Sequence, residues 1–396
     1  MNPSKRVQAM QASPIRKLIP LSLAAKKRGI HVYHLNIGQP DIPTPKEFFE
    51  AIRDFGGKVL KYQLSGGDPD LIHAIKTYFE RENIFFDEED IIITNGGSEA
   101  LSFALQAICD VGENVLVPEP FYTNYNGFTH QVGVFVKPIT TKAEGNFHLP
   151  AKEEIVKMID KNTKAILYSN PGNPTGVVYT EAEIRLLCDI AKEYDLMIIS
   201  DEVYRKMTFD GKVSISLGTF QDVADRAVII ESVSKRFSSC GARIGSIQSK
   251  NKVLMKEVLK LAQARLSVST IDQVGATALY ALDEEYVLSI RDEYKDRRDA
   301  VLAGLAKIDG VEYRIPSGAF YCIVTLPVED AEDFCAWLLS DFSYEKETIM
   351  LAPVRDFYVN KELGKKQVRI AYVLGASQMS RSMDLLKIAL EQYTNK

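Results

Sequence analysis

The sequence predicts an α/β fold, with a large domain whose mostly parallel sheet is flanked by helices and a smaller α+β domain. Three observations lead to this prediction. The chain has 396 residues, of which 46% are hydrophobic, so it can bury a sizeable core. Short β-rich runs show almost no alternation of polar and apolar residues, which indicates strands covered on both faces. Amphipathic segments with helical spacing separate these runs.

The elements of the large domain follow in chain order. Apolar runs predict its strands at residues 91–94, 115–117, 165–168, 196–200 and 227–230. Helical spacing predicts its helices at residues 98–110, 181–194 and 252–266. Strands that alternate with helices in this way are typical of a parallel sheet.

A second unit follows from the ends of the chain. A charged helix is expected at 286–308, and strands are expected at 318–324 and 367–372. The first forty-odd residues hold too little apolar sequence for a core of their own, so we expect them to join this unit. The predicted domains are therefore 45–285 for the large one, and 1–44 with 286–396 for the small one.

Composition excludes several classes of protein. The net charge is −5 and no long Lys/Arg cluster is present, so nucleic acid is not expected as a partner. The start, Met1-Asn2-Pro3-Ser4-Lys5-Arg6, lacks a secretory apolar region, and no run could span a bilayer. We expect no membrane partner and a cytoplasmic location. The five scattered cysteines and five histidines indicate neither a disulfide framework nor a metal site.

The first candidate site is the stretch Thr94-Asn95-Gly96-Gly97-Ser98-Glu99-Ala100, where a predicted strand gives way to a helix. A helix N-terminus offers free N–H groups, and glycine lets an anion approach the backbone. The stretch therefore suggests a phosphate cradle, although a simple turn would have the same glycines. It matches neither a dinucleotide fingerprint nor a P-loop.

Two more motifs follow predicted strands. Ser169-Asn170-Pro171-Gly172-Asn173-Pro174-Thr175-Gly176 combines two prolines and two glycines into a rigid loop that holds the amide of Asn173. Ser200-Asp201-Glu202-Val203-Tyr204 ends another strand with a carboxylate that needs a cation or donors. A rigid turn and a helix cap are the structural alternatives. Ligands bind at such strand ends in open α/β sheets.

The fourth motif is Ser232-Val233-Ser234-Lys235-Arg236-Phe237-Ser238-Ser239-Cys240-Gly241-Ala242-Arg243. Partial burial at a strand end would make the amine of Lys235 a nucleophile toward carbonyl groups. Arg243 provides a fork that suits phosphate or carboxylate. An anion held by Ser98, Ser232 and Arg243 would place an attached aldehyde near Lys235.

The order and spacing of these motifs resemble the class I aminotransferases, which are fold type I enzymes that depend on pyridoxal 5'-phosphate. The resemblance extends from Leu35-Asn36-Ile37-Gly38-Gln39-Pro40-Asp41 to Val368-Arg369-Ile370. It implies the catalytic residues Lys235, Asp201 and Tyr204. Lys235 would carry the cofactor covalently, and Asp201 would keep its pyridine nitrogen protonated. Tyr204 and Asn173 would bind the ring oxygen.

The resemblance also implies the other contacts. The phosphate would be held by Gly97, Ser98, Ser232 and Arg243, with Ser234 a weaker candidate. Tyr122 would stack on the cofactor ring, and Tyr62 would reach the phosphate of a neighbouring subunit, which implies a homodimer.

The same resemblance implies a substrate site. Arg369 would clasp the α-carboxylate of the substrate, with Gly38, Tyr122 and Asn173 beside it. No metal is implied. The segment Ser238-Ser239-Cys240-Gly241-Ala242 departs from the Thr-Gly-Trp pattern of many relatives, and Arg355 receives no role.

The function implied is a ping-pong transfer of an amino group from an L-amino acid to a 2-oxo acid, with aspartate as donor and 2-oxoglutarate as acceptor. The choice of aspartate rests on Ser13-Pro14-Ile15-Arg16 and Gly38-Gln39-Pro40-Asp41, which resemble the bacterial aspartate aminotransferase group. Alanine or aromatic donors remain open, as does a cysteine-conjugate β-lyase. A ligand-sensing module on the same fold is the alternative that is not an enzyme.

Overall fold

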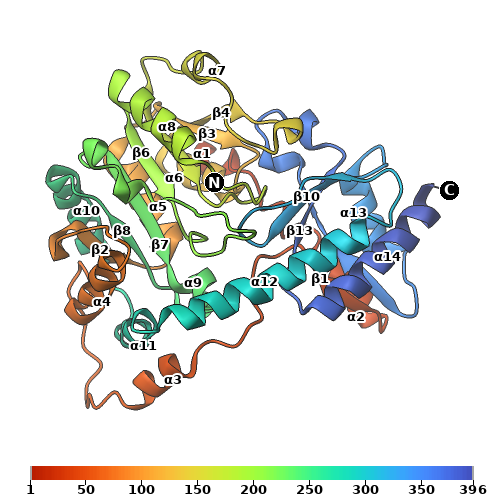
Figure 1. Cartoon of the computed structure of the whole chain (residues 1–396), viewed down its shortest axis with the longest axis horizontal. Coiled ribbons are helices and arrows are strands. Elements are labelled where there is room, and N and C mark those ends of the chain that lie inside the picture. The colour runs from red at the N-terminus through yellow and green to blue at the C-terminus, as the bar shows by residue number, and fades with distance from the viewer. Residues whose placement is uncertain (1, 395–396) are drawn as a thin grey trace.

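The computed structural model describes residues 2–394 and has two packed units (Figure 1). The larger unit contains a seven-stranded sheet in the order β2-β8-β7-β6-β5-β3-β4. Its strands are β2 (Ile91–Thr94), β3 (Asn114–Glu119), β4 (Phe135–Thr140), β5 (Thr163–Ser169), β6 (Met197–Asp201), β7 (Ala227–Ser232) and β8 (Gly245–Gln248). Only β8 runs antiparallel to its neighbours β2 and β7. The sheet is thus mostly parallel, as predicted.

Helices cover both faces of this sheet. One face packs against α5 (Gly97–Ile108), α6 (Asn124–Val132) and α10 (Lys252–Arg265). The other packs against α4 (Pro69–Glu80), α7 (Lys152–Val156), α8 (Glu181–Glu193) and α11 (Thr270–Tyr280). Ile198 and Ile229 lie in one core, whereas Ile199 and Ile230 lie in the other. Successive side chains of these strands are thus buried on opposite faces, which explains the non-alternating sequence.

The second unit has its own core, built mainly from both ends of the chain, with Tyr204, Met207 and Phe209 of the larger unit packed into it. A four-stranded sheet has the order β12-β13-β10-β9, and β1 pairs in parallel with β11. These strands are β1 (His31–His34), β9 (Glu312–Tyr313), β10 (Tyr321–Thr325), β11 (Glu347–Met350), β12 (Ala352–Pro353) and β13 (Gln367–Ala371). The helices α2 (Ile19–Lys27), α12 (Glu284–Leu305), α13 (Ala331–Ser340) and α14 (Ala376–Thr394) pack around them.

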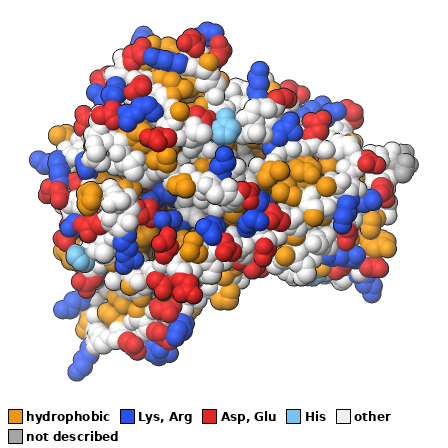
Figure 2. Space-filling view, in the orientation of Figure 1, with side chains coloured by type: hydrophobic (Ala, Val, Ile, Leu, Met, Phe, Trp, Pro, Cys, Tyr) orange, Lys and Arg blue, Asp and Glu red, His pale blue; other side chains and the backbone are white. Residues whose placement is uncertain are grey.

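The long helix α12 joins the two units (Figure 1). It begins at Glu284, with the side chain of Asp283 accepting a hydrogen bond from the backbone N–H of Tyr286. The helix therefore runs through the predicted boundary near residue 285. Three short helices complete the chain: α1 (Lys5–Gln8), α3 (Lys46–Arg53) and α9 (Val233–Arg236). The visible face of the molecule carries intermingled positive and negative side chains (Figure 2).

Candidate active site

A cavity of about 500 Å³ lies at the carboxyl ends of β5, β6 and β7. This is the edge of an open α/β sheet where ligands bind. All of the predicted site residues except Tyr62 line it. They are Gly38, Gly97, Ser98, Tyr122, Asn173, Asp201, Tyr204, Ser232, Lys235, Arg243 and Arg369, with Ser234 among them. Tyr62 lies instead in a loop, with 81% of its surface exposed.

The N-terminus of α5 forms one wall of the cavity. Gly96 has a φ of 76°, and a Cβ there would lie 2.4 Å from Nη2 of Arg243. A side chain at Gly245 would approach the backbone N of Gly97 to 2.6 Å. These two glycines let Arg243 and the first turn of α5 come together. The result is a concave group of N–H donors and a guanidinium, which is the chemistry that holds a phosphate.

Ser232 closes this wall from β7. Its Oγ donates to the carbonyl oxygen of Ile244 at 2.9 Å and contacts Oγ of Ser234 at 2.9 Å. It also accepts from the backbone N–H of Ser234 at 3.1 Å, which starts α9. The cap on α9 therefore fixes the turn that carries Lys235.

Lys235 is half-buried in the cavity. Its Nζ donates to the carbonyl oxygen of Gly38 at 2.7 Å and lies 3.8 Å from Sγ of Cys240. Among residues 2–394 no carboxylate lies within ion-pair distance of this amine. A lysine held by a backbone carbonyl rather than by a counterion can exchange that contact for a bond to a ligand.

Asp201 ends β6 and is 6% exposed. Burial raises the pKa of its carboxyl to about 6, although hydrogen bonds oppose the shift. The main one comes from the hydroxyl of Tyr125, which donates to Oδ2 at 2.7 Å. Oδ1 meets only the backbone N–H of Val203, at 3.5 Å. The carboxylate thus keeps one oxygen available for a cationic ligand.

Two phenols meet above the carboxylate. The hydroxyl groups of Tyr204 and Tyr321 lie 2.9 Å apart, and burial raises the pKa of Tyr204 well above its ordinary value. Tyr321 also explains why residue 38 is a glycine, because a Cβ there would lie 1.8 Å from the tyrosine hydroxyl. The loop at Gly38 can approach the cavity only without a side chain.

Arg369, on β13, is 1% exposed. Its Nη1 donates to Oδ1 of Asn173 at 3.0 Å, and its Nη2 donates to the carbonyl oxygen of Asn36 at 2.7 Å. Its Nε has no hydrogen-bond partner, and no described carboxylate pairs with it. Burial lowers the pKa of this guanidinium. The carboxylate of a ligand would provide the negative partner that Arg369 lacks.

The structure adds residues that the sequence analysis missed. Tyr125 binds Asp201, Tyr321 binds Tyr204, and Arg16 lines the cavity from the N-terminal segment. Tyr125 lies in the first turn of α6, whereas Tyr122 precedes that helix, so no helical spacing in the sequence links the two.

Arg355 receives an explanation outside the cavity. It pairs with Asp330 at 3.1 Å and with Glu362 at 3.0 Å. Cys240 lines the cavity, whereas the Oγ of Ser239 donates to the carbonyl oxygen of Phe237 at 2.8 Å. The other four cysteines are buried and unpaired.

The fold, with its sheet edge, cradle and half-buried lysine, is that of the fold type I enzymes that depend on pyridoxal phosphate. The sequence profile of the family "Aminotransferase class I and II" matches residues 30–384. The chain belongs to this family, and it is an aminotransferase.

Individual relatives agree over nearly the whole chain. The aspartate aminotransferase of Bacillus subtilis is 30% identical over 403 residues, which cover 99% of this chain and 98% of that one. An aspartate aminotransferase structure from Thermus thermophilus, solved with maleate, has a TM-score of 0.89 at 28% identity, covering 98% of this chain and 100% of that one. An alanine aminotransferase structure from Pyrococcus furiosus has a TM-score of 0.90 at 27% identity, covering 99% and 100%.

The cavity fits the family's cofactor, pyridoxal phosphate. The absence of a side chain at Gly96 lets the guanidinium of Arg243 lie against the N-terminus of α5, and together they provide donors that suit a phosphate. The free oxygen of Asp201 suits a protonated ring nitrogen, and the amine of Lys235 suits an aldehyde.

Within residues 2–394 no helix has the length and apolar character needed to cross a membrane.

Proposed function

We propose that this aminotransferase takes its amino group from L-aspartate and passes it to 2-oxoglutarate in a ping-pong reaction. The observation that carries the proposal is a pair of cavity arginines, Arg369 and Arg16, that lack acidic partners among the described residues. Each substrate of this reaction carries two carboxylates. Two unpaired guanidinium groups would match them.

The cofactor would be held by residues of the large unit. When bound, pyridoxal phosphate supplies an electron sink for the electrons released at the α-carbon of the substrate. Asp201 would bind its ring nitrogen, and Tyr204 with Asn173 would bind its ring oxygen. Tyr122 would cover one face of the ring. The phosphate would sit on Gly97, Ser98, Ser232 and Arg243, with Ser234 adjoining.

Lys235 would attach the cofactor and then act as the base. As the base, its Nζ would take the proton from the α-carbon of the bound substrate. The carbonyl oxygen of Gly38 now holds Nζ at 2.7 Å and would keep the amine inside the cavity.

Arg369 would bind the α-carboxylate of the substrate. Asn173 already orients this arginine through the 3.0 Å hydrogen bond, and would share the carboxylate with it. The guanidinium of Arg369 lies over the ring of Tyr321, 4.4 Å from the ring centre, and this contact helps to orient it. These contacts would fix which bond of the substrate breaks.

Aspartate is favoured over other donors for two reasons. The relative from Bacillus subtilis bears the name aspartate aminotransferase, and Arg16 provides a cation beyond the one used for the α-carboxylate. Arg16 is exposed at the cavity wall, where it lies close enough to Tyr122 to affect its pKa. The alanine aminotransferase from Pyrococcus furiosus supports alanine as the second candidate.

Assembly, domains and location also belong to the proposal. We infer a homodimer in which Tyr62 reaches the phosphate of the partner's cofactor, since its side chain is 81% exposed and lies outside its own cavity. The domains would be 45–285, and 1–44 with 286–396, in accord with the separate cores of the two units. The enzyme would act in the cytoplasm.

A single-turnover experiment tests the choice of donor. The purified, cofactor-loaded protein is mixed with one amino acid at a time, and the loss of its visible absorption band is timed. Aspartate should react about five times faster than alanine, since a charge pair with the exposed Arg16 contributes up to about 1 kcal/mol. Faster reaction with alanine or an aromatic amino acid would overturn the choice of aspartate. Pyruvate and ammonia formed from a β-substituted cysteine without 2-oxoglutarate would instead identify a β-lyase.

A further inference from the structure

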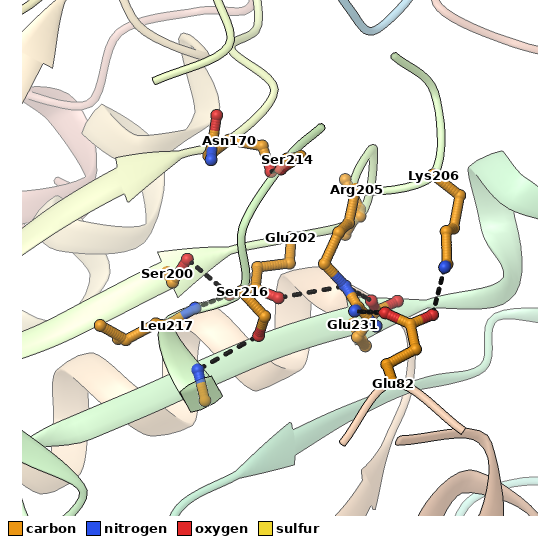
Figure 3. Close-up of polar contacts among 12 residues, drawn as sticks. Glu82, Asn170, Ser200, Glu202, Arg205, Lys206, Ser214, Ser216, Leu217 and Glu231 are labelled. Carbon is orange, nitrogen blue, oxygen red and sulfur yellow. Dashed lines mark hydrogen bonds and ion pairs between the residues drawn. The ribbon is translucent and has the colours of Figure 1, made fainter. Parts of the chain in front are cut away.

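A buried ion cluster lies at the carboxyl ends of β6 and β7 (Figure 3). We define it as Glu82, Glu202, Arg205, Lys206, Glu231 and Arg236. The inner four are almost inaccessible to solvent: Glu202 and Glu231 are 1% exposed, Arg236 is 2% and Arg205 is 3%. Three acidic and three basic side chains make the cluster formally neutral.

Glu231 is the centre of the cluster. Its Oε1 lies 3.5 Å from Nε of Arg205, and its Oε2 pairs with Nη2 of Arg236. Oε2 also accepts from the backbone N–H of Ser232 at 3.3 Å. One carboxylate therefore connects two arginines that come from different segments of the chain.

Glu202 and Glu82 complete the shell around Arg205. Glu202 lies 3.2 Å from Nε of Arg205 and accepts from the backbone N–H of Leu217 at 2.8 Å. Glu82 pairs with both Arg205 and Lys206. Burial raises the pKa of Glu202 to about 7, against the pull of Arg205.

Aromatic rings form the floor of the cluster. The guanidinium of Arg236 lies 4.3 Å from the ring centre of Tyr78 and 6.0 Å from that of Tyr280. Arg205 donates to the hydroxyl of Tyr78 at 3.3 Å. These tyrosines come from α4 and α11.

Each central member of the cluster is the chain neighbour of a residue in the cavity. Glu202 follows Asp201, Arg205 follows Tyr204, Glu231 precedes Ser232, and Arg236 follows Lys235. In β7 the successive side chains of Glu231 and Ser232 point to opposite faces. Arg205 lies in the turn after β6 and Arg236 lies in α9, so these segments also carry one residue of each site. The cluster therefore holds the segments that carry Asp201, Tyr204, Ser232 and Lys235 through the next residue along the chain.

Stability alone does not explain such a cluster. Burying charges costs several kcal/mol per ion, and apolar replacements of buried ion pairs are often as stable. What ion pairs provide is a fixed geometry between segments, together with a fixed local charge. Both matter for the cavity, because burial raises the pKa of Asp201 and the nearby carboxylate of Glu231 raises it further.

We propose that Glu231, held between Arg205 and Arg236, is a positioning residue that sets the place and the local charge of Lys235 and Asp201. The inference rests on the proposed roles of those two residues. Glu231 links the turn after β7, through Arg236, to the segment after β6, through Arg205. Because the cluster as a whole is formally neutral, it places no net charge beside the cofactor site. Tyr125 faces Asp201 from the other side and is uncharged.

The test is the pH midpoint of the visible absorption band of the cofactor-loaded protein, measured in Glu231→Gln and Arg236→Met. The acidic form of this chromophore carries one more positive charge than the basic form. Glu231→Gln leaves the cluster with excess positive charge and should lower the midpoint by about half a pH unit or more. Arg236→Met leaves excess negative charge and should raise the midpoint by a similar amount.

The controls separate charge from general loosening. Arg298→Met removes another buried arginine, paired with Asp210 outside the cluster, and should leave the midpoint unchanged. Arg236→Lys restores the charge and should return the midpoint toward the original value. Lys206→Met, at the half-exposed rim, should shift the midpoint in the same direction as Arg236→Met but by less, and it serves if a central variant does not fold.

Shifts of the same sign in Glu231→Gln and Arg236→Met would overturn the inference, as would shifts no larger than that of Arg298→Met. If the central variants do not fold, an unshifted midpoint in Lys206→Met would overturn it. A visible band that is unchanged in Lys235→Ala would contradict the proposed role of Lys235 instead. A visible band whose midpoint does not change in Glu231→Gln and Arg236→Met would contradict the role of the cluster and leave the role of Lys235 intact.

Discussion

Positively charged side chains have different partners in the cavity and in the buried ion cluster. On the cavity side Lys235, Arg243 and Arg369 contact backbone carbonyls, an amide and a thiol. Among residues 2–394 none of the three has a carboxylate within ion-pair distance. On the other side Arg205 and Arg236 are paired with glutamates. The comparison indicates that cations without acidic partners line the cavity where ligands bind, whereas the buried, paired cations hold the framework.

Loss of Lys235 should have the largest effect on the cavity side. Lys235→Ala removes both the attachment point and the base, so kcat should fall by at least about 10³-fold. Steady-state transamination of aspartate measures it. Lys152→Ala removes an exposed lysine that is paired with Glu193 and should retain full activity. A Lys235→Ala protein within tenfold of the original rate would contradict the assignment.

Arg369→Met should come next. It removes the guanidinium that we assign to the α-carboxylate, so kcat/KM should fall by about 10² to 10³-fold. Because every amino acid has this carboxylate, the loss should be similar for aspartate and alanine. Arg298→Met is the matched control, since it removes a buried arginine that is already paired. A loss confined to aspartate would show that Arg369 reads the side chain instead.

Asp201→Asn should stabilise the cofactor-free protein at neutral pH. Burial raises the pKa of Asp201 to about 6, from 3.8 when unfolded. The folded state therefore holds its proton longer, and the free energy of unfolding falls as pH rises from 4 to 6. Above that range the original protein has lost about 3 kcal/mol that Asp201→Asn retains. Urea unfolding at pH 4 and pH 8 measures the difference.

Asp210→Asn provides a control of opposite sign. A hydrogen bond from Arg298 lowers the pKa of Asp210, so this carboxylate contributes stability above its unfolded pKa and loses it in acid. Asp210→Asn should therefore be less stable than the original protein at pH 8. Equal effects of the two substitutions at pH 8 would contradict the contrast between paired and unpaired charge.

Arg16→Gln should have the smallest effect, because this arginine is exposed. Exposed charge pairs contribute up to about 1 kcal/mol, so kcat/KM for aspartate should fall about fivefold. The value for alanine, which has no second carboxylate, should remain unchanged. Arg6→Gln, in the exposed first helix, is the control. An equal loss for both amino acids would remove Arg16 from side-chain recognition.

The parts of this picture that the sequence could predict are local. The strand ends at Asp201 and Ser232 follow from non-alternating apolar runs, and their chemistry is visible in adjacent residues. Tyr125 and Tyr321 were missed because they meet Asp201 and Tyr204 across 76 and 117 residues of chain. Such contacts depend on how helices and units pack, which no short motif records.

The strand β8 and the ion cluster were missed for related reasons. The sequence of β8, Gly-Ser-Ile-Gln, has little apolar character, yet it is buried because β2 and β7 flank it. Glu231 and Arg236 lie within the sequence around Lys235 but point away from the cavity. Their partners come from distant segments, so only the folded chain reveals the pairing.

The most direct test of the account is to locate the covalent attachment of the cofactor. The protein loaded with pyridoxal phosphate is reduced with borohydride, digested and analysed by mass spectrometry. The account predicts that the added cofactor mass lies on Lys235, the unpaired lysine of the cavity. Attachment to Lys206 or to another paired lysine, or no specific attachment, would contradict it.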